Sequence, residues 1–224
     1  MSPNLQTLSE SIEIDGVSFQ TFISHTILPI PEKVRGGKTW FKAGIRITNN
    51  TPEDYYFFDF PDMLRPYINL PSGEVFRAGF DTDSMMLPRN HNLTLAEPGE
   101  SVDILWNACL AWTQFNKNII KTKKKIRGVP EPYQTDPKLT FIFSFRTYVV
   151  LYYAAMNPFP PKPDKYQFRF TYSMQANLEN SQNEIDGFFQ YIMPKVHNKI
   201  WVGSVQTPFV PIEIVDREVV ISEK

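Results

Sequence analysis

Two segments near opposite ends of the chain carry the strand pattern that most constrains its fold. In Lys38–Thr51, four apolar residues occupy every second position: Phe41, Ala43, Ile45 and Ile47. Such a period of two is typical of a strand that buries one face and leaves the other in water. Lys199–Val215 is the second strand-like segment. Together the two segments favour an all-β fold built from half-buried strands.

The composition supports the same fold class. The chain of 224 residues contains 18 Phe, 10 Tyr and 19 Pro. Aromatic residues suit the pleated surface of a strand, whereas proline is excluded from central strands and concentrates in turns. We therefore predict a single antiparallel β-sandwich domain of eight to ten strands with long loop excursions, spanning residues 12–216. In this prediction residues 1–11 form a polar tail and residues 217–224 a charged tail.

Turn signals divide the rest of the sequence into further strands. Ser101–Thr113 alternates like the first segment, and we expect it to pair with Leu93–Ala96 around a turn that contains Pro and Gly. Pro66–Phe76 is predicted to be a hairpin that turns at Pro71–Gly73. Tyr166–Met174 is expected to form another strand, because aromatic and polar residues alternate along it.

Four stretches also resemble a known kind of domain. Their sequences are FKAGIRITNNT, LTLAEPGESVDI, YQFRFTYS and KIWVGSVQTPFVPIEIV. They are similar to the strand pattern of immunoglobulin-like domains in uncharacterised bacterial proteins and, at a lower level, to the small β-sandwich of bacterial intracellular proteinase inhibitors. The resemblance implies an immunoglobulin-like sandwich, although this chain lacks the cysteine pair that bridges the two sheets in antibody domains. It transfers no functional residue to this chain.

A long basic segment, Gln114–Pro137, interrupts the strand pattern. Its 24 residues exceed the usual length of a connection in a compact domain, which is typical of either a functional or a mobile loop. Five of its cations are predicted to contact a partner: Lys121, Lys123, Lys124, Lys125 and Arg127. The isoleucines Ile119, Ile120 and Ile126 are expected to dock the segment onto the sandwich or onto that partner. Simple solvation of the charges is the alternative interpretation.

An aromatic cluster at residues 55–60 is the second candidate surface. Its rings follow one another without regular alternation, so some of them must point away from the core. The predicted partner contacts are Tyr55, Tyr56 and Phe58. Exposed tyrosine rings are typical of protein hot spots and of sugar-binding platforms. An extra packing layer over the sheet would explain the same cluster without a binding function.

An acidic stretch, Asp81–Ser84, suggests an alternative function. Asp81 and Asp83 could supply carboxylate oxygens to a calcium ion at the edge of the sandwich. Calcium needs about six to eight oxygen ligands, and solvated loop carboxylates explain the same residues without a metal. The alternative hypothesis is therefore a carbohydrate- or small-ligand-binding protein that is assisted by calcium. No other cofactor is expected.

The charge limits the partners. A formal net charge of −1 gives no overall field for nucleic acid, and the basic segment lacks the interleaved aromatic residues of a single-strand groove. Nucleic acid is therefore not an expected partner. Leu139–Met156 is apolar, but Arg146 lies near its middle and its Phe, Tyr and Val residues favour buried strands. We expect no transmembrane span.

Cysteine usage and the first residues predict a cytoplasmic protein. Cys109 is the single cysteine, so no internal disulfide can form, and its place within Ser101–Thr113 predicts a packed thiol rather than a reactive one. The first sixteen residues contain neither a basic start nor an apolar run, so we expect no secretory signal.

The sequence contains few catalytic signals. It has no glycine-flanked nucleophile elbow and no metal-ligand spacing, while a pair of acid–base carboxylates would be set by the fold rather than by spacing. We therefore predict a non-catalytic protein–protein interaction or scaffolding module that binds another protein or a second copy of itself. The ligand-binding protein is the alternative, and an enzyme is the third hypothesis.

Overall fold

The computed structural model describes eight stretches of the chain. These are residues 6–34, 37–60, 63–77, 92–113, 138–145, 148–150, 161–174 and 199–217. They contain fifteen strands, of which seven have six or more residues. The other eight are short strands of two to four residues, which is why the count exceeds the eight to ten strands predicted.

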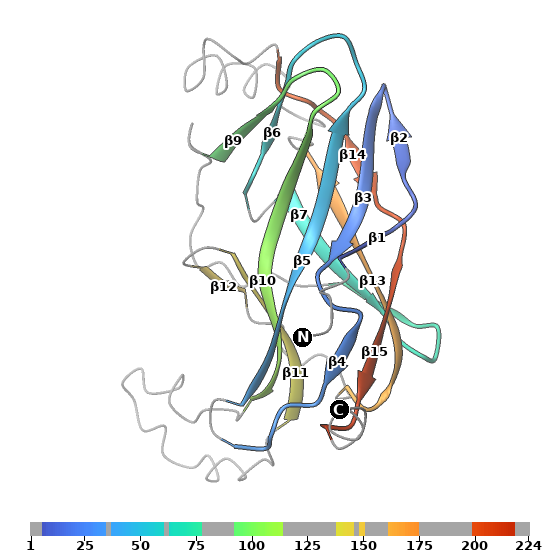
Figure 1. The fold of residues 1–224 in the computed structure, drawn as a ribbon, viewed down its shortest axis with the longest axis vertical. Helices are drawn as coiled ribbons and strands as arrows, with labels where there is room; N and C mark the ends of the chain where they lie inside the picture. The colour runs from blue at the N-terminus through green and yellow to red at the C-terminus, as the bar shows by residue number, and fades with distance from the viewer. Residues whose placement is uncertain are drawn as a thin grey trace, which may run out of the picture.

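Seven strands form the first sheet, sheet A. In spatial order they are β1 (Thr7–Leu8), β3 (Val17–Ile23), β5 (Lys38–Asn49), β10 (Ser101–Thr113), β11 (Lys138–Phe145) and β12 (Tyr148–Val150), with β2 (Ile12–Ile14) paired to β3. All of these described pairings are antiparallel. In Figure 1, sheet A lies in front of the second sheet.

Six strands form the second sheet, sheet B. In spatial order they are β4 (Ile27–Pro29), β15 (Val210–Val215), β13 (Asp164–Ser173), β7 (Leu64–Asn69) and β8 (Val75–Arg77), with β14 (Ser204–Gln206) paired to β13. The pairing of β4 with β15 is parallel, whereas the others are antiparallel. A separate small sheet consists of β6 (Tyr55–Phe58) and β9 (Leu93–Ala96).

The pairing of β5 with β10 is the centre of sheet A. Eleven consecutive Cα pairs join the two strands, from Ser101–Thr48 to Ala111–Lys38. The alternating apolar residues of β5 that the sequence singles out are all buried. A Cβ atom at Gly44 would overlap the carbonyl oxygen of Ile104 on β10, so glycine is needed for the strands to approach this closely.

Aromatic rings fill the space between sheets A and B. Phe141 of β11 meets Phe168 of β13 edge to face, with ring centroids 5.1 Å apart. Phe143 lies 5.8 Å from the Phe168 ring, and Phe41 lies 6.1 Å from it. These separations and tilted geometries are the ones that packed aromatic pairs favour. The two sheets therefore enclose one shared core, and the predicted all-β sandwich is confirmed.

Two hairpin turns use backbone conformations that favour glycine. In the β7–β8 hairpin, which the sequence predicts, Gly73 has a φ of 85° and its N–H donates to the carbonyl oxygen of Leu70 over 2.8 Å. In the β2–β3 hairpin, Asp15 and Gly16 have φ values of 50° and 76°. Two consecutive positive φ angles are the mark of a type I′ turn, whose twist matches that of the flanking strands.

One predicted pairing is wrong. The sequence pattern places β9 next to β10, but β9 pairs with β6. One edge of β10 pairs with β5 from Ser101 to Ala111, and the other edge pairs with β11 only from Asn107 to Thr113, so β11 does not exclude β9 from the first residues of β10. The buried side chain of Asn49 fixes β9 at the end of β5, since its Nδ2 donates to the carbonyl oxygens of Ala96 over 2.9 Å and of Glu53 over 2.7 Å.

Candidate functional site

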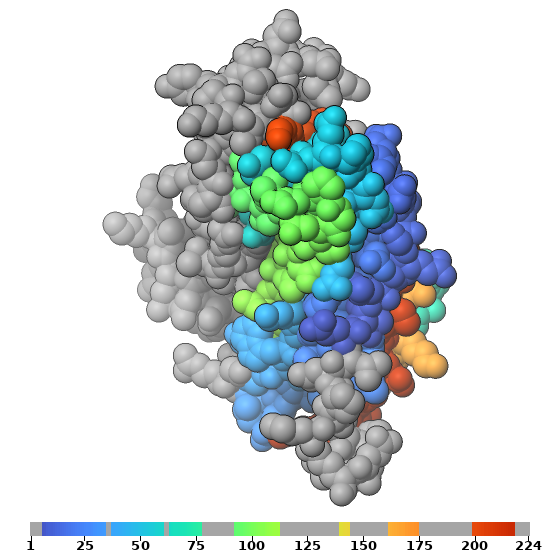
Figure 2. Space-filling view, turned by 45° about the horizontal axis from the view of Figure 1, so that its top comes forward, coloured from blue at the N-terminus to red at the C-terminus, as the bar shows by residue number. Residues whose placement is uncertain are grey.

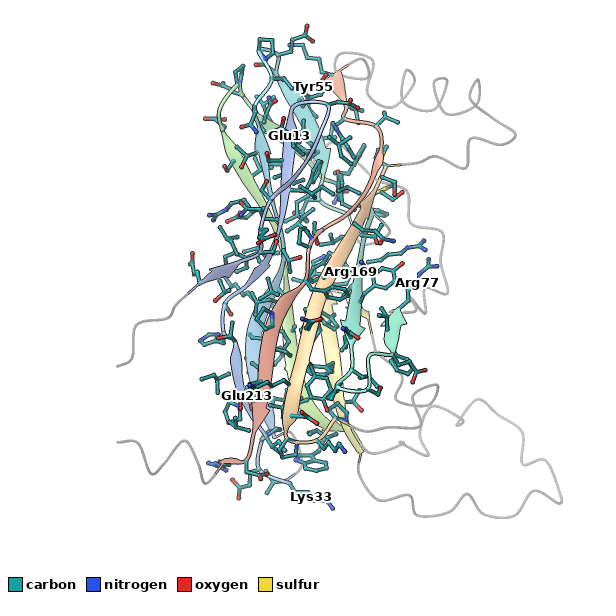
Figure 3. All side chains as sticks on the ribbon, turned by 90° about the vertical axis from the view of Figure 1, so that its right-hand side faces the viewer. Glu13, Lys33, Tyr55, Arg77, Arg169 and Glu213 are labelled. Carbon is teal, nitrogen blue, oxygen red and sulfur yellow. The ribbon has the colours of Figure 1, made fainter. Side chains whose placement is uncertain are left out.

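Cations and aromatic rings alternate across the outer face of sheet B, the face turned away from sheet A. Arg77 of β8 lies opposite Tyr67 of β7, and Tyr67 lies opposite Arg169 of β13. Phe209, which directly precedes β15, contacts Arg169 from the β15 side. We call these four residues the arginine–aromatic row. Figure 3 shows the side chains of Arg77 and Arg169 on the same side of sheet B.

Arg169 is held by aromatic rings rather than by a carboxylate. Its Cζ atom lies 4.5 Å from the ring centroid of Phe209 and 5.5 Å from that of Tyr67. Both distances are within the roughly 6 Å range of cation–π attraction. In the described part of the chain Arg169 has neither a hydrogen-bond acceptor nor an ion-pair partner, and its Nε atom is buried. The guanidinium is therefore positioned but unpaired.

Two more buried polar atoms on the same face have no hydrogen-bond partner within the described residues. They are Oγ1 of Thr171 and Oδ1 of Asn69. Thr171 follows Arg169 by two residues on β13, and Asn69 follows Tyr67 by two residues on β7, so strand alternation places all four on one face. An unpaired buried polar group costs about 1–3 kcal/mol. Arg169, Thr171 and Asn69 therefore each carry a buried polar atom that makes no hydrogen bond within the described chain.

Buried threonines fix the position of Phe209. The N–H of Thr207 donates to the carbonyl oxygen of Phe170 over 2.9 Å, and its hydroxyl oxygen accepts from the N–H of Phe170 over 3.0 Å. The carbonyl oxygen of Pro208 accepts a 2.6 Å bond from the hydroxyl of Thr21 on β3. Because both residues that precede Phe209 are bonded to neighbouring strands, the backbone of Phe209 is held beside the arginine–aromatic row.

The positive charge of the row is not compensated within the described residues. On sheet A, Arg46 donates to both carboxylate oxygens of Asp103 over 2.7 and 2.8 Å, and this contact raises the pKa of Arg46. Neither Arg77 nor Arg169 has such a partner in the part of the chain that the structure describes. Glu213 of β15 lies opposite Lys165, which is four positions before Arg169 on β13. Glu213 is therefore displaced from Arg169 by roughly 13 Å along the strand.

The predicted aromatic contacts lie at one end of the sandwich. Tyr55 and Tyr56 are half-buried, whereas Phe58 is fully buried in the core. The Phe58 side chain cannot reach a partner on the surface and is a packing residue, so two tyrosines of this cluster remain candidate contacts. Tyr56 forms a parallel bridge with Ile200, and Figure 2 shows residues near 199–203, in orange-red, beside this end of the molecule.

The remaining predicted contacts lie outside the described residues. They are the cations Lys121, Lys123, Lys124, Lys125 and Arg127 and the acids Asp81 and Asp83. The strand ends on either side of the basic segment, Thr113 and Lys138, pair at the end of sheet A opposite to β6 (Figure 1). The 13 residues of β10 span roughly 40 Å between the two ends. The flanks of the basic segment and the two tyrosines are therefore far apart.

The described stretches contain neither a cluster of metal-ligating side chains nor a membrane-spanning helix. No three His, Cys, Asp or Glu side chains there are grouped so that they could hold a metal ion, and the calcium hypothesis on Asp81 and Asp83 stays untested. No helix in the same stretches is long and apolar enough to cross a membrane. The apolar segment Leu139–Met156 begins within β11, and Leu139, Phe141 and Phe143 are buried there.

Two groups with potential reactivity are buried. Cys109 is buried on the outer side of β10, and desolvation raises the pKa of its thiol against a weaker opposing effect of Lys38. The predicted packed thiol is therefore confirmed. Burial also raises the pKa of Tyr172, whose hydroxyl oxygen accepts a 2.8 Å bond from the N–H of Phe58. Neither group is poised as a nucleophile.

Comparison with known proteins leaves the function open. A scan against models of protein families gives no match to this chain, and a search of curated proteins gives none either. The arginine–aromatic row is therefore the strongest guide to function, and sequence reasoning had missed it. Alternation along Tyr166–Met174 places Arg169 on the outer face, but its ring partners, Tyr67 and Phe209, come from distant segments.

Proposed function

We propose that this protein is a non-catalytic β-sandwich module that binds another protein through the outer face of sheet B. The observation that carries the proposal is Arg169, which two rings hold in place while its charge is unpaired. Tyr and Arg are enriched among the residues that dominate protein–protein binding energy. A cation that is already fixed loses little side-chain entropy when a partner binds.

The unpaired polar atoms beside the row support a protein as the partner. The terminal guanidinium nitrogens of Arg169 are donors, whereas the exposed side-chain amide of Gln206 on the same face carries an acceptor. A polypeptide surface supplies both, since every peptide unit other than proline carries one donor and one acceptor.

A photoreactive amino acid at position 206 tests the proposal. Gln206 is exposed, its side chain makes no hydrogen bond in the described chain, and it lies opposite Thr171 on the outer face of sheet B. The matched control is position 107, because Asn107 is equally exposed and lies on the outer face of sheet A. Both variants are irradiated in the cells that produce the protein, and crosslinked products are identified by mass spectrometry.

The proposal predicts a discrete crosslinked protein from position 206 and not from position 107. The same protein, purified separately, should bind the unmodified chain in calorimetry. Identical products from both positions, or none from position 206, would contradict a docking surface on sheet B. A product of twice the chain mass would show that a second copy of the chain occupies the face, and would overturn the assignment to a different protein.

We also propose the immunoglobulin-like relationship and the cytoplasmic location as parts of this account. The relationship is supported by the strand sequences of β5, β10, β13 and β15, which fall in one sandwich. The location is supported by the single buried cysteine, which forms no disulfide within the chain. Cell fractionation with an antibody against the chain tests the location, and recovery from an extracellular or membrane fraction would contradict it.

A further inference from the structure

We infer that Arg169 is a receptor for a carboxylate group, so that the protein segment that docks on sheet B is acidic. The inference rests on the proposed function and adds the chemistry of the partner. It starts from the difference between two arginines. Arg46 already holds the carboxylate of Asp103 in a two-pronged contact, whereas Arg169 has the same donors and no acceptor in the described chain.

The contacts of Arg169 leave its donors available. The rings of Tyr67 and Phe209 contact the Cζ atom and attract the delocalised charge, but they accept no conventional hydrogen bond. Nε is buried, and the two terminal nitrogens are not among the buried unpaired atoms, so they face solvent. A carboxylate can accept two parallel bonds from a guanidinium, which is the strongest pairing open to it.

A second cation strengthens the preference for an acidic segment. Arg77 is exposed and lies on the other side of Tyr67, two strands from Arg169 and therefore roughly 10 Å away between Cα atoms. It too lacks a carboxylate partner in the described stretches. Two unpaired cations at this spacing are complementary to two carboxylates on the same face of an extended segment. Such carboxylates lie two or four residues apart, roughly 7 or 13 Å, which the long arginine side chains can accommodate.

The same geometry argues against a single-stranded nucleic acid. Binding of that kind stacks successive bases on free ring faces. Arg169 occupies a face of both rings in the row, Tyr67 and Phe209, so each base would have to displace the guanidinium from the ring or use the other face. A carboxylate instead binds with the rings in their present positions. We therefore assign the row to an acidic protein segment.

Nuclear magnetic resonance of the full chain tests this assignment. The probe is an amide-capped hexaglutamate peptide, and the readout is the 15Nε–1Hε resonance of Arg169, which is assigned by its loss in Arg169→Lys. This signal reports the immediate surroundings of the Arg169 guanidinium. The corresponding resonance of Arg46 is the matched control in the same spectrum, because Asp103 already occupies that guanidinium.

The assignment predicts a saturable shift of the Arg169 resonance with hexaglutamate, no shift with hexaglutamine, and no shift of the Arg46 resonance. In Phe209→Leu, which keeps the charge but loses the ring, the dissociation constant should rise at least fivefold. An unmoved Arg169 resonance, or equal shifts with both peptides, would overturn the assignment. A larger shift with hexathymidylate than with hexaglutamate would assign the row to nucleic acid and would likewise overturn it.

The outcome is separable from the test of the proposed function. If a protein crosslinks at position 206 and binds the chain but hexaglutamate does not shift the Arg169 resonance, the docking surface is retained and the inference that the docking segment is acidic is wrong. If hexaglutamate shifts the resonance but no protein crosslinks at position 206, Arg169 binds carboxylates and the docking function is wrong.

Discussion

Replacing Thr207 by valine should destabilise the sandwich by about 2–4 kcal/mol. Valine keeps the shape of threonine and removes its hydroxyl, which is fully buried and contacts three groups. The N–H of Phe170 then loses its acceptor, at a cost of about 1–3 kcal/mol for a buried orphan donor. The single hydroxyl proton of Thr207 has Oγ1 of Thr21 and the carbonyl oxygen of Phe170 as alternative acceptors, and the loss of that one bond adds about 1 kcal/mol. The hydroxyl of Thr21 keeps Pro208 as an acceptor.

Thr21→Val is the matched control, because Thr21 is equally buried and belongs to the same hydroxyl pair. It deprives no backbone N–H of an acceptor among the described bonds, so we expect a smaller cost of about 1 kcal/mol. The double variant should cost less than the sum of the two, since both single variants remove the bond between the hydroxyls. Urea unfolding followed by tryptophan fluorescence measures all three free energies of unfolding.

Two results would refute this reasoning. A Thr207→Val variant within about 0.5 kcal/mol of the parent would mean that the hydroxyl is not a required partner of Phe170. A larger cost for Thr21→Val than for Thr207→Val would mean that the carbonyl oxygen of Pro208, rather than the N–H of Phe170, is the group that depends on the pair.

Three further predictions concern buried groups. Tyr172→Phe should cost about 1–3 kcal/mol at pH 7, because the N–H of Phe58 loses its acceptor. Burial raises the pKa of Tyr172 above its ordinary 10, so the folded state keeps the proton while the unfolded chain ionises. Parental stability should therefore fall above about pH 10, by up to about 1.4 kcal/mol per pH unit, and less steeply in Tyr172→Phe; equal slopes in urea unfolding would contradict this. Cys109 should react with Ellman's reagent stoichiometrically in urea and at least tenfold more slowly when folded, and equal rates would show an accessible thiol. Gly44→Ala should lower the free energy of unfolding by about 1–3 kcal/mol, because its Cβ would overlap the carbonyl oxygen of Ile104; an unchanged unfolding midpoint would contradict that contact.

The central strands could be predicted because their own residues carry the signal. Alternation along β5 and β10 identifies both the strands and their buried faces, and Ser101–Thr113 is recovered to the residue. The partner of β9 could not be predicted in this way. Alternation shows which face of a strand is buried but not which strand lies beside it, and here the side chain of Asn49 helps to decide.

The candidate site depends on pairings that the sequence does not display. The sequence directs attention to runs of similar residues, the lysine-rich segment and the aromatic cluster. Phe58 belongs to such a run and is a core residue, because β6 packs into the sandwich end. Arg169 belongs to no such run. It becomes a candidate only in the fold, because strand register places Tyr67 beside it and the hydrogen bonds of Thr207 place Phe209 there.

The most direct test of a docking surface on sheet B compares two alanine variants in binding to the protein captured at position 206. Tyr67→Ala removes a ring of the arginine–aromatic row, whereas Trp40→Ala removes the exposed ring on the outer face of sheet A, where the Trp40 side chain is 55% exposed. Isothermal titration calorimetry should show at least tenfold weaker binding for Tyr67→Ala, or about 1.4 kcal/mol, and less than twofold change for Trp40→Ala. Unchanged binding by Tyr67→Ala together with a large loss in Trp40→Ala would contradict the account and place the docking surface on sheet A.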